Sequence, residues 1–187
     1  MSAPYFGKAV PVTLRRFPLL HAKNLAGAKV CVPNDLPDAP FHVVTLNFKN
    51  KHVWNARTWA GLHSSLEILL QHKGENNSAH IYHLFVFPSL YRLWSPIWKT
   101  RCKTWAQENF IPQQNVLVVY GDRDAICNDI GILNDGRQYA FLLRPSGKIL
   151  FATDGRYTGQ KHDSTIQKAV RTLYDEKAKQ PSIEEHH

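Results

Sequence analysis

The fold of this chain is decided by one stretch near its carboxyl end, QYAFLLRPSGKILFAT (residues 138–153). Its two halves, 138–143 and 148–153, are rich in aromatic and aliphatic residues, and the residues Pro-Ser-Gly (145–147) separate them. Apolar runs joined by a short turn of this kind are typical of a β-hairpin. The stretch therefore predicts two neighbouring antiparallel strands.

Three further apolar runs upstream predict buried strands, and they lie at residues 41–48, 80–87 and 116–120. They are rich in the β-branched and aromatic residues that strands favour. Between the first two runs, apolar residues recur at steps of three and four, which is the spacing of one helix face. This predicted helix ends near Gly74 and presents Trp59, Leu62, Leu66, Leu69 and Leu70.

Two more helices are predicted further along the chain. The first carries an aromatic stripe that we interpret as core, with Pro96 in its first turn and with Trp94, Trp98, Cys102 and Trp105 at helical spacing. The second begins at about Asp163, a residue suited to cap a helix. The polar stretch that contains Asp122, Asp124 and Asp129 is expected to be a solvated turn rather than a calcium loop.

Strands that alternate with helices imply crossover connections and parallel pairing, whereas the late hairpin requires antiparallel strands at the edge. The predicted class is α/β, with a central mixed sheet flanked by helices. This order is that of the thioredoxin-like fold. The hairpin followed by Gly155 and a last helix resembles the second half of peroxiredoxins.

The composition excludes several classes of protein. Of the 187 residues, 43% are hydrophobic, so disorder is excluded. Three scattered cysteines are too few for a disulfide framework. The apolar run 83–93 is too short, and too interrupted, to span a membrane. The net charge of +8 and the pI of about 9.5 indicate an acidic partner: nucleic acid, an anionic membrane, or acidic protein neighbours.

The chain is predicted to have three parts: a basic N-terminal arm that contains prolines (1–40), a thioredoxin-like domain (41–178) and a polar tail (179–187). No acidic residue precedes Asp35, a bias found both in organelle transit peptides and in arms that lie on neighbouring subunits. Because the regular pattern begins only at Phe41, removal of residues 1–35 is expected to leave the domain folded.

The redox centre of thioredoxin-like enzymes is missing. Their working cysteine lies in the loop after the first core strand, at a helix N-terminus that lowers its pKa. Here that loop, residues 49–58, contains no cysteine, and residues 134–138 contain no proline before the hairpin strand. Cys102 is expected in the core, which leaves Cys31 and Cys127 as candidates for an alternative thiol enzyme.

No other catalytic, metal or cofactor motif is present. His80 and His83 are three residues apart on a predicted strand, so their side chains point to opposite faces and cannot share an ion. Gly-rich phosphate loops, nucleophile elbows and zinc-protease motifs are absent from the sequence. We expect no catalytic residue, no metal site and no cofactor.

Short motifs along the chain resemble those of the mitochondrial ATP synthase assembly-factor family, a non-catalytic, peroxiredoxin-related group with a thioredoxin-like fold. They are Phe17-Pro18 through Gly27, Val32-Pro33, Leu36-Pro37, Trp59, Ile130-Gly131-Ile132-Leu133-Asn134, and the hairpin with Gly147 and Gly155. Leu150 and Phe151 depart from the arginine and tryptophan of that family. The resemblance implies an assembly factor or accessory subunit that binds subunits of a multi-subunit complex, with ATP synthase as the first candidate. It also implies a location on the matrix side of the mitochondrial inner membrane.

Two alternatives from other classes remain. One is a divergent thiol oxidoreductase or peroxiredoxin that uses Cys31 or Cys127. The other is a mitochondrial ribosomal protein, because the charge is +8 and the five tryptophans lie within residues 54–105. For the main hypothesis, the predicted docking surface for an acidic partner or anionic lipid combines the arm and the loop after the first strand, through Arg15, Arg16, Lys49, Lys51 and Arg57.

Overall fold

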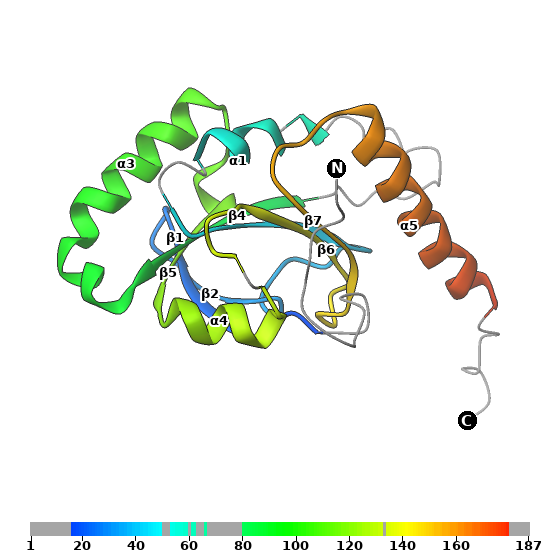
Figure 1. Cartoon of the computed structure of the whole chain (residues 1–187), viewed down its shortest axis with the longest axis horizontal. Helices are drawn as coiled ribbons and strands as arrows, with labels where there is room; N and C mark the ends of the chain where they lie inside the picture. The colour runs from blue at the N-terminus through cyan, green and yellow to red at the C-terminus, as the bar shows by residue number, and fades with distance from the viewer. Residues whose placement is uncertain are drawn as a thin grey trace.

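The computed structural model describes residues 16–49, 53–59, 61–62, 66, 80–132 and 134–179. Its centre is a seven-stranded mixed sheet with the strand order β2-β1-β5-β4-β3-β6-β7. Helices α1, α3 and α5 lie on one side of this sheet and α4 on the other (Figure 1). The α/β class and the thioredoxin-like arrangement are thereby confirmed.

The strands are β1 (Leu20–Asn24), β2 (Lys29–Val32), β3 (His42–Asn47), β4 (His80–Pro88), β5 (Val116–Gly121), β6 (Tyr139–Leu143) and β7 (Ile149–Asp154). The helices are α1 (Val53–Trp59), α3 (Ser95–Glu108), α4 (Arg123–Ile130) and α5 (Gln160–Lys179), with 3-10 turns η3 (Ser89–Trp94) and η4 (Gln113–Asn115).

The centre of the sheet has the predicted pairing. Strand β4 is parallel to both β3 and β5, while β6 is antiparallel to β3 and to β7. All six residues of β3 are buried, as a strand covered on both faces requires. In the hairpin turn Gly147 has φ +78°, and a Cβ there would lie 3.0 Å from Pro33, so this turn depends on glycine.

The apolar core is divided by the sheet. On one face α4 packs through Ile126 and Ile130 against side chains that include Leu46 and Leu84. On the other face Trp59 packs with Ile166 and Val170 of α5. Trp59, Leu62 and Leu66 are buried as predicted, whereas Leu69, Leu70 and Gly74 lie outside the described residues.

The sequence predicts a regular pattern only from Phe41 onward, whereas the structure has two strands in the described part of the N-terminal arm. Strands β1 and β2 form an antiparallel hairpin, and β1 pairs with β5, so this segment extends the sheet by two strands. Along β1 buried and exposed residues alternate, with Leu20 and Ala22 inward and His21 and Lys23 outward. Because only two apolar residues mark the inner face of β1, the alternation in the sequence is too short to predict a strand among the basic residues.

The solvated turn predicted around Asp122 is also wrong, because α4 occupies it. The Asp122 carboxylate accepts hydrogen bonds from the backbone N–H groups of Asp124 (2.9 Å) and Ala125 (3.3 Å), which caps the helix. The next helix, α5, begins at Gln160, three residues before the predicted cap, and Asp163 lies in its first turn. Residues 180–187 of the predicted tail lie outside the described residues.

Candidate functional site

The thioredoxin fold places a redox cysteine between the end of β3 and the start of α1. In this chain β3 ends at Asn47, α1 begins at Val53, and residues 49–58 contain no cysteine. The β3 end is instead closed by α1, whose Ala56 and Trp59 are buried against the sheet. The position that would carry a thiolate therefore carries none.

Beneath α1 the sheet holds a small polar cluster, formed by Thr45 and Asn47 of β3 and His83 of β4. His83 Nδ1 lies 2.9 Å from Thr45 Oγ1, and the Asn47 amide donates to Thr45 Oγ1 (3.2 Å) and to the Leu84 carbonyl (3.0 Å). Burial lowers the pKa of His83 to about 3. The ring is therefore neutral near pH 7, and it serves as a packing and hydrogen-bonding group.

Gln138 stands immediately before β6, in the region where the sequence lacks the expected proline. Its side chain is fully buried, and neither of its amide atoms has a hydrogen-bond partner among the residues that the structure describes. Leu46 pairs with Tyr139, so Gln138 follows this ladder beside Asn47, whose Oδ1 also has no partner. This end of the sheet is therefore buried and polar, and none of the described cysteines lies on its strands β3 and β6.

The three thiols lie elsewhere. Cys102 is buried in α3 as predicted, and burial raises its pKa to about 12. Cys127 is buried in α4, contrary to the expectation that it could be exposed, and burial raises its pKa to about 11. Cys31 is half-buried on β2, the outermost strand, away from the β3 end. None of these thiols replaces the missing redox cysteine in position.

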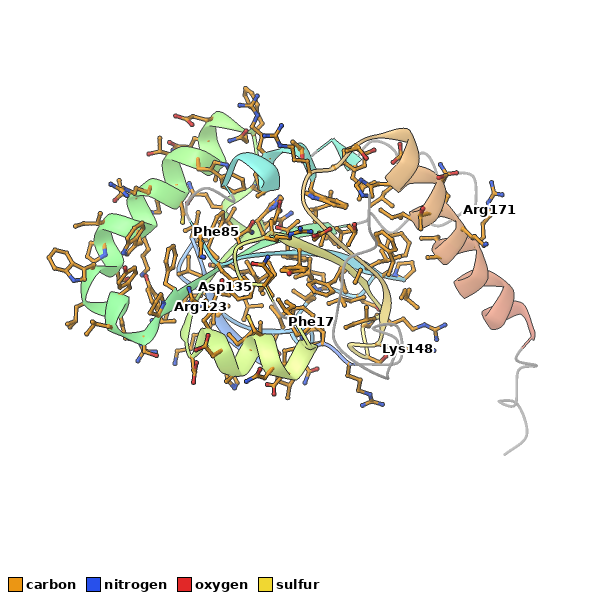
Figure 2. All side chains as sticks on the ribbon, in the orientation of Figure 1. Phe17, Phe85, Arg123, Asp135, Lys148 and Arg171 are labelled. Atoms are coloured by element: carbon orange, nitrogen blue, oxygen red, sulfur yellow. The ribbon has the colours of Figure 1, made fainter. Side chains whose placement is uncertain are left out.

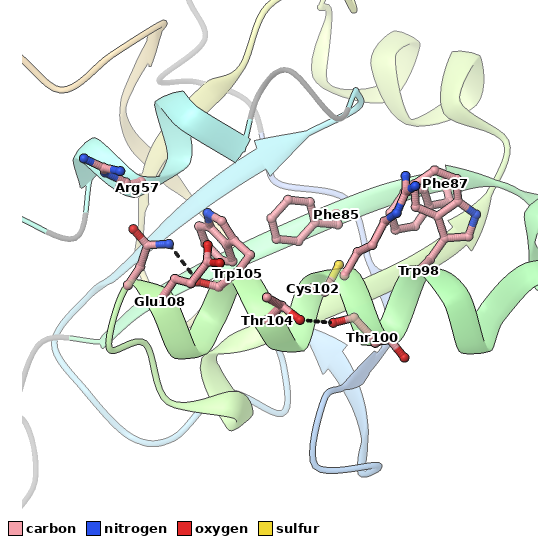
Figure 3. A pocket seen from close by; sticks show the side chains of 11 residues that line it. Arg57, Phe85, Phe87, Trp98, Thr100, Cys102, Thr104, Trp105 and Glu108 are labelled. Atoms are coloured by element: carbon pink, nitrogen blue, oxygen red, sulfur yellow. Dashed lines mark hydrogen bonds between the residues drawn. The ribbon is translucent and has the colours of Figure 1, made fainter.

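An open cleft of about 450 Å³ lies between α1, α3 and β4. Its floor and walls are mainly aromatic, from Phe85 and Phe87 of β4 and from Trp98 and Trp105 of α3. Figure 3 shows Trp98 beside Phe87 at one end of this cleft and Trp105 at the other. Trp98 stacks on Phe87 with ring centroids 5.0 Å apart. The cleft thus offers an apolar surface next to helix α1, which follows the loop that lacks the redox cysteine.

Charged side chains stand around this aromatic cleft. Arg57 of α1 and Arg101 of α3 contribute two positive charges, and Glu108 contributes one negative charge. The Arg101 guanidinium lies 5.1 Å from the centroid of the Trp98 ring, a cation–π distance. Arg57 projects from α1 near the Trp105 end of the cleft (Figure 3). The arrangement fits a ligand with apolar groups and negative charge, and it contains no nucleophile with a lowered pKa.

The residues predicted to dock a partner do not gather in one place. Arg15 and Lys51 lie outside the described residues. Arg16 is exposed, and its backbone forms an isolated antiparallel β-bridge with the backbone of Lys148. This β-bridge lies at the end of the sheet where β3 begins. Lys49 lies beyond the opposite end of β3, about 20 Å away for a strand of six residues, and Arg57 lies on α1 beside the aromatic cleft.

Lys49 forms an ion pair with Asp135 at 3.3 Å. Arg57 is exposed and lines the aromatic cleft. A single docking patch made of arm and loop therefore does not form among the described members. Their role in partner binding stays a prediction.

The sequence also misassigned Trp94. Its helical spacing predicted a core position, but the side chain is 59% exposed. Helix α3 begins at Ser95, so Trp94 belongs to η3 and leaves the helical stripe. Pro96 was the available signal, because a proline in the first turn fixes where the helix starts.

Each helix in the described part of the chain is too short or too polar to span a lipid bilayer. The described part of the chain also contains no group of three His, Cys, Asp or Glu side chains placed to hold a metal ion. His80 and His83 lie on opposite faces of β4, where they contact Tyr82 and Trp105 respectively.

No protein-family model and no curated protein matches the chain. Solved structures do match. BsSco, a member of the Sco family of cytochrome c oxidase assembly proteins, is 13% identical, with a TM-score of 0.54 over 85% of this chain and 94% of that one. Yeast Sco1 is 16% identical, with a TM-score of 0.52 over 84% and 95% of the two chains.

A thiol-disulfide oxidoreductase from Bacteroides fragilis is 13% identical, with a TM-score of 0.52 over 82% of this chain and 98% of that one. At such identities the likeness establishes the thioredoxin-like fold alone. None of these three structures supports the resemblance to the ATP synthase assembly-factor family, which stays a prediction from the sequence.

Proposed function

We propose that this chain is a thioredoxin-fold binding protein without thiol chemistry, which acts as an accessory subunit or assembly factor of a larger complex. The observation that carries the proposal is the β3–α1 junction, where the redox loop has no cysteine and an open aromatic cleft lies alongside. The sequence resemblance supports a mitochondrial inner-membrane complex, with ATP synthase as the specific candidate and the matrix side as the location.

The partner that fits the cleft is an extended protein segment with apolar side chains and at least one carboxylate. Phe85, Phe87 and Trp105 would bury the apolar groups, and the excess of guanidinium groups over Glu108 favours negative charge. A cleft of about 450 Å³ has room for a few side chains of such a segment.

Reversing the two cations of the cleft is expected to lower recovery of the partner at least tenfold. The variant Arg57→Glu/Arg101→Glu makes the cleft negative, and truncating or reversing charges at buried contacts commonly costs about 2 kcal/mol or more. The measurement is native co-purification with tagged full-length chain, followed by crosslinking and mass spectrometry. Crosslinks from the partner should map to residues that line the cleft.

The matched control is Lys148→Glu/Arg171→Glu, which reverses two exposed charges. Figure 2 shows Lys148 and Arg171 at the far side of the molecule from α3. This control should recover the partner as the unmodified chain does. Equal loss in both variants, or crosslinks that avoid the cleft, would show that the cleft is not the binding site.

The second candidate is a thiol–disulfide oxidoreductase, and the structural neighbours favour it, because one of them is an enzyme of this class. Its nucleophile would be Cys31, since this thiol is half-buried whereas Cys102 and Cys127 are buried. The candidate requires a thiolate that forms readily near neutral pH.

Thiol labelling separates the two candidates. With pKa values raised from 9.0 to about 12 and about 11, Cys102 and Cys127 should form thiolate roughly a thousandfold and a hundredfold less than ordinary cysteines. If the chain is a binding protein, the thiols of the unmodified native chain should all react slowly with a thiol-specific alkylator at about pH 6, whereas the enzyme should show one fast reaction that Cys31→Ser removes. Insulin reduction by the unmodified chain that Cys31→Ser abolishes would overturn the proposed binding function in favour of the enzyme.

A further inference from the structure

The 3-10 turn η3 exposes large apolar side chains. Leu90 is 71% exposed, Leu93 79% and Trp94 59%, and none of the six residues of η3 is buried. Tyr91 and Ile97 are exposed beside them. We call these five residues the apolar rim. Single exposed apolar residues are ordinary on a protein surface, but a contiguous group of this kind marks an interaction site.

All charged residues of the segment that carries the apolar rim are basic. Residues 89–107 contain Arg92, Lys99, Arg101 and Lys103 and no acidic residue. Tryptophan, tyrosine and leucine interleaved with lysine and arginine form the composition of segments that lie in a membrane interface. The rim and its flanking charges therefore share one short stretch of chain.

A second, independent feature adjoins the rim: a pocket of about 440 Å³ between the β1–β2 hairpin and the start of α3. Its positive charges come from four different elements, β1, β2, η3 and α3. We call it the basic pocket, and its ionisable basic side chains are His21, Lys23, Lys29, Arg92 and Lys99. Asp35 is its one acidic lining residue, and one of its carboxylate oxygens accepts the Cys31 N–H at 2.7 Å.

The cations of the basic pocket are not neutralised internally. Among the described residues, neither Lys23, Lys29, Arg92 nor Lys99 forms an ion pair. Four lysine and arginine side chains and one carboxylate line the pocket, so its lining carries an excess of positive charge. An excess of lysine and arginine side chains around one pocket attracts an anionic group, and phosphate is an anion that both residues commonly bind.

The basic pocket and the apolar rim share one short segment of the chain. Within residues 90–99, Arg92, Ser95 and Lys99 line the basic pocket, while Tyr91, Trp94 and Ile97 line a shallow apolar depression. Neighbouring residues of η3 and the start of α3 therefore line both the basic pocket and the apolar depression. A ligand that fits both must present an anionic group next to an apolar one.

We propose that this surface docks on an anionic phospholipid membrane, with the basic pocket holding a lipid phosphate headgroup and the apolar rim entering the interface beneath the headgroups. This docking goes beyond the proposed binding of a protein segment, because the basic pocket shares no lining residue with the aromatic cleft. A lipid bilayer is favoured over a protein partner, since the most exposed rim residues protrude from a turn without buried residues rather than line a groove.

The test is flotation of the purified full-length chain with vesicles of phosphatidylcholine alone and with phosphatidylglycerol added. The chain should bind the anionic vesicles and bind neutral ones far more weakly. Replacing three cations, in Lys23→Gln/Arg92→Gln/Lys99→Gln, should weaken binding about a hundredfold, because each cation near an anionic membrane contributes about fivefold. The variant Leu93→Ser/Trp94→Ser should weaken binding to the same vesicles by a factor of about ten or more.

The matched control removes three basic side chains elsewhere, in Lys148→Gln/Lys168→Gln/Arg171→Gln, and should retain most of the binding. Equal losses in the control and in the pocket variant would overturn the site, since the attraction would then be general. A pocket that binds inorganic tripolyphosphate in a soluble titration while the chain ignores vesicles would overturn the lipid as ligand. Vesicle binding needs no protein partner, so this outcome and that of the co-purification are independent.

Discussion

Removing residues 1–35 is expected to abolish the cooperative unfolding transition of this protein. The deletion takes Phe17, Leu20 and Val32 out of the core, and it strips β5 of its neighbour β1. Phe17 packs edge-on against Phe141 with ring centroids 5.4 Å apart. Loss of one large core side chain typically costs about 2–5 kcal/mol, and the whole folded state is worth only about 5–15 kcal/mol.

The measurement is thermal unfolding followed by circular dichroism in the far and near ultraviolet. Deletion of residues 1–15 is the matched control, because it leaves every described core residue in place. That control should unfold cooperatively, whereas the longer deletion should show no transition and no near-ultraviolet signal. A deletion of residues 1–35 that unfolds near the temperature of the full chain would show that the β1–β2 hairpin is dispensable.

Acidification is expected to destabilise the folded state through two buried histidines. Burial lowers the pKa of His42 to about 4, with a smaller contribution from the charge of His80, and burial lowers that of His83 to about 3. Both values lie below the 6.5 of an unfolded chain, so the unfolded state binds more protons as the pH falls. Their effect is absent above about pH 7, and stability is lost progressively as the pH falls from 6.5 through the two lowered values.

Together these two groups should lower the free energy of unfolding by roughly 5 kcal/mol between about pH 7.5 and pH 4.5. Urea denaturation at the two pH values measures the difference. The double variant His42→Gln/His83→Gln should show a much smaller difference, and His21→Gln, a change at an exposed position, should retain that of the unmodified chain. An undiminished difference in the double variant would assign the acid sensitivity to other groups.

The sequence predicted the centre of the sheet because its strands are rich in β-branched and aromatic residues. All six residues of strand β3 are buried, because the sheet is covered on both faces at this strand. Strand β1 has the opposite character, since only alternate residues face the core and the others are His21 and Lys23. From its composition this segment is therefore predicted to be a basic arm. Its alternation of buried and exposed residues, with a period of two, is that of a strand.

The candidate sites were harder to predict, because they depend on where elements start and how distant segments meet. The missing redox cysteine could be read from residues 49–58 once the strand before them was placed. The basic pocket could not, since Lys23 and Arg92 are brought together by the pairing of β1 with β5. Trp94 shows the same limit, because a shift of the helix start by one residue moves a side chain from core to surface.

Strand β2 also determines how copies of the protein behave toward one another. It is the last strand on its side of the sheet, it has only four residues, and it begins with Lys29. Pro33 follows it directly and has no N–H to offer an incoming strand. A second molecule would find few backbone groups and a like charge at this edge. Concentrated solutions should therefore resist polymerisation by strand addition along β2.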